Sequence, residues 1–78
     1  MLEYVLLMED CKEIIYAYYP GGDSDKGIIS YNKESGEITI QKLSEKDQHR
    51  IYALKMCKRI CEFVKEGVFR KSGYIAWY

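Results

Sequence analysis

The sequence has few of the residues that would point to a particular chemistry. It contains one proline, one histidine and three cysteines in 78 residues, and its 12 basic and 12 acidic side chains give a net charge of zero. An odd number of cysteines argues against a disulfide framework. Zero net charge means that the chain lacks the overall positive excess typical of nucleic-acid-binding domains. The length fits a single small domain over residues 1–78.

Long hydrophobic runs are also missing. The apolar stretch over residues 2–8 contains Glu3 and is far shorter than the roughly 20 residues that cross a bilayer. No basic segment precedes it and no small-residue cleavage site follows it, so a signal peptide is not expected. We therefore expect a cytoplasmic protein with no membrane partner.

Aromatic and β-branched residues are abundant and are arranged in short runs. Residues 2–8, 12–19, 27–31 and 37–43 have the composition of strands, and the last of these alternates, with Ile38 and Ile40 on one side followed by Lys42. The Gly- and Asp-rich segment 20–27 and the turn sequence 32–36, with Gly36, separate them. Four strands joined by short connections predict an antiparallel meander.

One amphipathic helix is expected after the fourth strand. Ser44 and Asp47 resemble a capping box, and Gly67 stands where a glycine ends a helix, which predicts about five or six turns. The expected apolar stripe, widened by Ala53, Met56 and Phe63, comprises Ile51, Leu54, Cys57, Ile60, Cys61 and Val64. A helix across a one-sided sheet gives a two-layer α+β fold, with the aromatic segment 74–78 as a short terminal strand or tail.

Evidence for catalysis or for a cofactor is poor, and we expect neither a catalytic nor a metal site. His49 is the only histidine, and it lies among charged residues where a solvated position is expected. A metal site would require Cys11, Cys57, Cys61 and His49 to converge from distant segments. Cysteines that pack as small apolar residues need no such coincidence.

The tyrosines suggest an interaction surface. The chain has eight of them, more than one helix is expected to cover. If the surplus lies on the uncovered face of the sheet, it forms an aromatic patch that suits a protein partner or a second copy of the chain. The residues assigned to this patch are Tyr4, Tyr16, Tyr18, Tyr74, Trp77 and Tyr78.

The charge distribution supports an alternative. Residues 1–41 carry three basic and eight acidic side chains, net −5, whereas residues 42–78 carry nine basic and four acidic ones, net +5. A nucleic-acid or other anionic partner is therefore the second hypothesis. The residues assigned to this basic surface are Lys55, Lys58, Arg59, Arg70 and Lys71.

Overall fold

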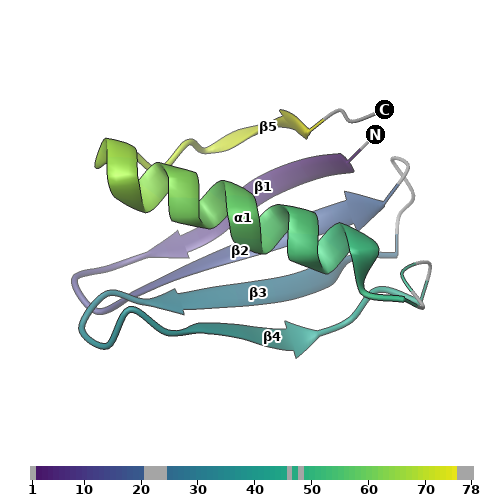
Figure 1. Ribbon diagram of the computed structural model, residues 1–78, viewed down its shortest axis with the longest axis horizontal. Helices are drawn as coiled ribbons and strands as arrows, with labels where there is room; N and C mark the ends of the chain where they lie inside the picture. Colours follow the sequence, from purple (N-terminus) through teal and green to yellow (C-terminus); the bar gives the residue numbers. More distant parts are fainter. Residues whose placement is uncertain (1, 21–24, 46, 48, 76–78) are drawn as a thin grey trace.

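Five strands and one helix make up the secondary structure in the computed structural model, which describes residues 2–20, 25–45, 47 and 49–75. The elements are β1 (Leu2–Glu9), β2 (Glu13–Pro20), β3 (Gly27–Asn32), β4 (Ile38–Lys42), α1 (Ile51–Glu66) and β5 (Ser72–Ile75). The strands form one antiparallel sheet, and α1 lies across one of its faces (Figure 1). The expected two-layer α+β fold is confirmed.

The strand order is β4-β3-β2-β1-β5, so β2 is the central strand and β4 and β5 form the two edges. The first four strands are the predicted meander. The expected terminal strand is also confirmed, because β5 pairs with β1 through Leu2 opposite Ile75 and Val5 opposite Ser72. Trp77 and Tyr78 lie outside the described residues.

Local sequence accounts for both described hairpin turns. In the β1–β2 turn, Asp10 Oδ1 accepts hydrogen bonds from the backbone N–H groups of Lys12 (2.8 Å) and Glu13 (2.7 Å). In the β3–β4 turn, Gly36 has a φ of 76°, a left-handed conformation that glycine adopts without a Cβ penalty. The predicted turn at residues 32–36 is therefore confirmed.

Tyrosines line the covered face because glycines give them room. Tyr18 lies opposite Gly27 on β3, and Tyr4 lies opposite Gly73 on β5. A Cβ atom at Gly27 would collide with the Tyr18 ring, and one at Gly73 would lie 2.6 Å from the Tyr4 hydroxyl oxygen. An aromatic ring laid over a cross-strand glycine replaces the packing that the glycine lacks.

The core lies between these strands and one stripe of α1. The buried helix residues are Ala53, Met56, Ile60 and Phe63. The Phe63 ring centroid is 5.7 Å from that of Tyr4 and 5.9 Å from that of Tyr16, within the range of favourable aromatic contacts. Ile60 and Met56 are fully buried, as is Ile29 on β3.

The predicted start of the helix is wrong. α1 begins at Ile51, not near Ser44, because Arg50 has a left-handed φ of 60° that interrupts any earlier helix. Asp47 supplies the cap from outside the helix: its carboxylate oxygens accept hydrogen bonds from the N–H groups of Tyr52 (3.0 Å) and Ala53 (2.9 Å). Ser44 Oγ instead donates to the carbonyl oxygen of Asp25 at 2.8 Å. At the other end, Gly67 ends the helix with a φ of 74°, as predicted.

Candidate interaction surfaces

The proposed aromatic patch does not form as predicted. Tyr4 is 1% exposed and Tyr16 and Tyr18 are 0% exposed, because all three point toward α1 and fill the core. Tyr74, on the edge strand β5, is 65% exposed and remains available to a partner. Trp77 and Tyr78 lie outside the described residues, so Tyr74 is the one member of the predicted patch that the described part of the chain places at the surface.

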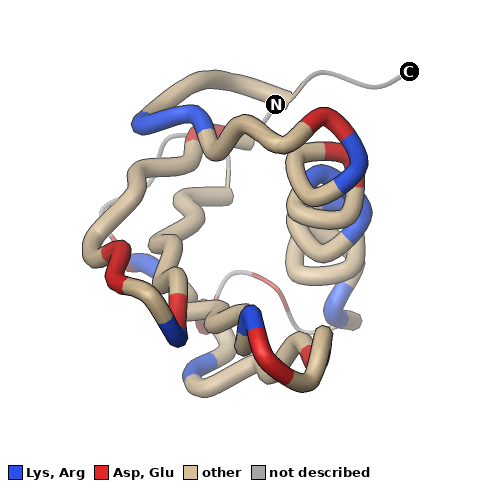
Figure 2. Tube along the Cα trace, turned by 90° about the vertical axis from the view of Figure 1, so that its left-hand side faces the viewer, with Lys and Arg blue, Asp and Glu red and all other residues tan. Residues whose placement is uncertain are grey.

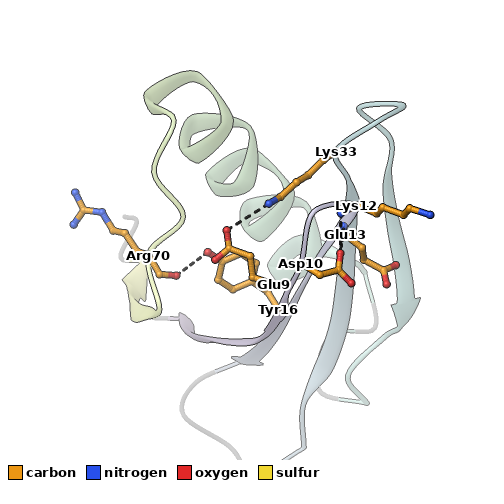
Figure 3. A network of polar contacts seen from close by, with 7 residues as sticks. All are labelled: Glu9, Asp10, Lys12, Glu13, Tyr16, Lys33 and Arg70. Carbon is orange, nitrogen blue, oxygen red and sulfur yellow. Dashed lines mark hydrogen bonds and ion pairs between the residues drawn. The ribbon is translucent and has the colours of Figure 1, made fainter.

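The buried tyrosine hydroxyls hold the structure together. Tyr16 donates a hydrogen bond to the carbonyl oxygen of Arg70 at 2.7 Å, which ties the central strand to the segment before β5 (Figure 3). Tyr18 donates to Asp47 Oδ2 at 3.2 Å and accepts from the Ser44 N–H at 3.3 Å. Burial raises the pKa of Tyr16 and raises that of Tyr18 to about 12.

The uncovered face of the sheet is apolar over β1 and β2, where its side chains are mainly aliphatic. The neighbouring strands β3, β4 and β5 also place Ser30, Thr39 and Ser72 on this face. Because Tyr16 and Tyr18 point toward α1, Ala17 points away from it, and Ala17 pairs with Val5 on one side and Ile28 on the other. A bulge in β1 between Leu6 and Met8 makes Leu7 the extra residue; Met8 pairs with Ile15, and the exposed Leu7 stands beside it. We call the following residues the outer face: Val5, Leu7, Met8, Ile15, Ala17, Tyr19, Ile28 and Tyr74.

Sequence reasoning missed most of this surface. Leu7 is 48% exposed and Met8 is 38% exposed, and Val5, Ile15 and Ile28 are partly buried. The available signal was the alternation of β2, in which Ile15, Ala17 and Tyr19 share one side. The number of tyrosines by itself does not predict that aliphatic residues make up most of this surface.

Few charged side chains interrupt the outer face. Glu3 lies on β1, opposite Tyr74 and Tyr19, and Glu13 is at the start of β2. Lys42 lies on the edge strand β4, opposite Ile28, because a second bulge between Ile28 and Ile29 makes Gln41 the extra residue. The prediction that Lys42 continues the alternation of Ile38 and Ile40 is therefore wrong. The two acidic groups and Lys42 lie on different strands of the same face.

A second exposed apolar surface lies on one flank of α1. Its members recur at i, i+3, i+7, i+10 and i+14, which aligns them along the helix. They are Leu54, Cys57, Cys61 and Val64, continued by Val68 just beyond the helix, and we call them the α1 flank. Leu54 is 60% exposed and Val68 is 57% exposed. Burial, and secondarily the nearby Cys61, raises the pKa of Cys57.

The residues of the predicted basic surface do not form one patch. Arg59 Nη1 lies 3.4 Å from Glu62 Oε1, and the Arg59 guanidinium lies over the Phe63 ring. Lys58, Arg70 and Lys71 are exposed, and Lys55 is partly buried. Figure 2 shows basic and acidic positions interspersed around the molecule, so the difference in charge between the two halves of the sequence does not become one positive side.

The acidic residues at the β1–β2 turn have structural partners (Figure 3). Glu9 Oε2 lies 3.5 Å from Lys33 Nζ, which links β1 to the β3–β4 turn. Hydrogen bonds from the backbone N–H groups of Lys12 and Glu13 lower the pKa of Asp10. These contacts give the carboxylates roles in the turn geometry.

The described residues offer no evident centre for chemistry. His49 is exposed and precedes α1, Cys11 is exposed in the β1–β2 turn, and all three cysteines are free. Within residues 2–20, 25–45, 47 and 49–75, no three metal-ligating side chains gather, and no helix is long and apolar enough to cross a membrane. Comparison with protein-family models, with curated proteins and with solved structures finds no match to the chain.

Proposed function

We propose that this chain is a non-enzymatic cytoplasmic protein-interaction module that forms a homodimer through the outer face of its sheet. The observation that carries the proposal is the apolar character of that face over β1 and β2, to which the described residues supply no covering layer. A sheet in a two-layer fold normally exposes polar side chains on its outer face. Three free cysteines are in keeping with a reducing compartment.

The size of the outer face suits a weak dimer. Neighbouring strands lie about 4.8 Å apart and rise about 3.3 Å per residue, so five short strands present a face of about 20 by 20 Å. With side-chain relief, two copies would bury roughly 1,000–1,200 Å² in total, which is at the low end of specific interfaces. We therefore expect dissociation in the micromolar range.

The charges on the face favour a particular arrangement of the two copies. A two-fold axis parallel to the central strand β2 places β4 of one copy over β5 of the other, and β3 over β1. Lys42 on β4 then lies over β5 of the second copy, level with Ser72, and Glu3 on the neighbouring strand β1 is the nearer of the two acidic residues of that face. The same pairing occurs twice, once on each side of the axis. Two stacked sheets lie about 10 Å apart, which a lysine side chain can largely span.

Sedimentation equilibrium tests the proposal with a matched pair of variants. Leu7→Lys places a charge in the interface, and a cost of about 2 kcal/mol would raise the dimer dissociation constant about 30-fold. Val68→Lys is the control, because Val68 is 57% exposed, comparable to Leu7 at 48%, but lies on the α1 flank. The control is expected to dimerise like the wild type. A wild-type chain that stays monomeric at millimolar concentration would refute the proposal.

A charge exchange tests the arrangement separately. Lys42→Glu is expected to weaken the dimer at low salt, and adding Glu3→Lys is expected to restore it. If the double variant is as weak as the two single changes combined, the copies do not associate about the axis parallel to β2.

A further inference from the structure

We propose that the α1 flank, together with β4, binds an amphipathic helix of another protein whose apolar stripe is bordered by acidic side chains. This site is separate from the outer face, because it lies on the opposite side of the sheet. The proposal rests on the position of the α1 flank, on the partly exposed core residues beside it, and on the sign of the charges around it.

The α1 flank repeats the buried stripe one residue later. The buried residues Ala53, Met56, Ile60 and Phe63 have the spacing i, i+3, i+7 and i+10, and the flank has the same spacing from Leu54 onward. One residue turns about 100° around a helix. The helix therefore has one apolar stripe against the sheet and a second, parallel stripe at its side.

That side faces the β4 edge. Arg59, on the opposite flank, interacts with Tyr4 on β1 and so marks the side toward β1 and β5. The α1 flank consequently faces β3 and β4. Residues of these strands and of the segment after them are only partly buried against the core: Tyr31, Ile38, Ile40 and Leu43. Helix and sheet thus present apolar side chains toward the same space.

The spacing of helices and strands places a second helix above β4. α1 contacts β2 and β3 and leaves β4 at the edge of the covered face. Packed helices lie 8–10 Å apart, which equals about two strand spacings. A second helix beside α1 would therefore lie above β4, where it could contact Ile38 and Ile40 below and Leu54 and Val64 at its side.

The charges next to the α1 flank determine the sign of charge that we expect on the partner. Lys58 and Lys65 are exposed and border the α1 flank on its solvent side, whereas Glu62 and Glu66 lie farther around the helix. The α1 helix of a second copy would bring the same lysines against each other, which is unfavourable at an interface. An acidic amphipathic helix provides the complementary sign.

Two synthetic 18-residue helical peptides with the same leucine stripe, one bordered by glutamates and one by lysines, test the site on the full chain. We expect the glutamate peptide to bind at least tenfold more tightly in fluorescence anisotropy. Its binding should shift the amide NMR signals of Leu54, Val64, Ile38 and Ile40. Equal affinity for the two peptides, or shifts confined to the outer face, would overturn the proposal.

Variants distinguish this site from the proposed dimer interface. The double change Lys58→Glu with Lys65→Glu is expected to reverse the preference between the two peptides, and Leu54→Asp is expected to weaken binding of the glutamate peptide at least tenfold. Leu7→Lys is expected to weaken the dimer and leave peptide binding unchanged. A disulfide-linked dimer joining Cys57 to Cys61 of a second copy under mild oxidation would identify that copy as the occupant and refute the partner proposed above.

Discussion

Replacing Asp47 by alanine is expected to be among the most destabilising single changes at a polar residue of this chain. Its carboxylate, in a residue 2% exposed, accepts hydrogen bonds from two N–H groups of the first turn of α1 and from the Tyr18 hydroxyl. Loss of a helix cap costs about 0.5–2 kcal/mol, and a buried hydroxyl left without its acceptor costs about 1–3 kcal/mol. We therefore expect Asp47→Ala to lower the free energy of unfolding by about 2–4 kcal/mol.

That loss is large for a chain of this size, whose total stability is expected to be about 4–12 kcal/mol. Urea denaturation followed by circular dichroism would measure it as a lower midpoint with an unchanged slope. In a double-mutant cycle with Tyr18→Phe, we expect a coupling of about 0.5–1.5 kcal/mol between the two side chains. If Asp47→Ala costs less than 0.5 kcal/mol, the cap is not what starts α1.

Two further predictions concern the buried tyrosines. Gly27→Ala forces a Cβ atom into the Tyr18 ring and is expected to cost about 1–3 kcal/mol in urea denaturation; combining it with Tyr18→Leu should cost less than the sum of the two changes. Because burial raises the pKa of Tyr18 from 10.0 to about 12, its contribution, on the order of 2–3 kcal/mol, is complete below pH 10 and is lost as the pH rises through 12. Absorbance at 295 nm should then show the buried tyrosines ionising together with unfolding, and ionisation of every tyrosine near pH 10 in a folded chain would contradict this.

The strands and turns could be predicted because their signals are local. Alternation in residues 37–40, the glycine at position 36 and the asparagine and aspartate residues of the turns act within a few residues of where they stand. The helix end at Gly67 is of the same kind. Pairing of β5 with β1 depends on contacts between the two ends of the chain, so the sequence predicts the strand but not its neighbour.

The start of the helix shows a local signal overridden by distant contacts. Ser44 and Asp47 have the spacing of a capping box, yet each side chain has a different partner in the structure. Ser44 Oγ donates to the carbonyl oxygen of Asp25, which precedes the neighbouring strand β3. The Asp47 carboxylate accepts hydrogen bonds from the first turn of α1 and from the Tyr18 hydroxyl on the central strand. Neither contact is visible in the residues near position 44.

The burial of Tyr18 and Tyr4 under α1 depends on glycines that lie on neighbouring strands. Tyr18 and Tyr4 fit under α1 because Gly27 and Gly73 lie opposite them, and the second of these pairs joins β1 to β5. Without the strand pairing, the sequence predicts that eight tyrosines exceed what one helix covers. The covered face accepts large rings where its neighbours are glycines, and aliphatic residues are left for the outer face.

A shared physical cause explains both exposed apolar surfaces. A helix is about 10 Å wide and covers about two strands of a sheet, whereas this sheet has five. The single helix in the described residues therefore leaves part of its own face open at β4, and leaves the second face entirely without a helix. A chain this short can form only a small core, so residues such as Leu7, Leu54 and Val64 reduce its solubility unless another surface covers them. The two proposed contacts, one with a second copy and one with a helical partner, would each cover one of these surfaces.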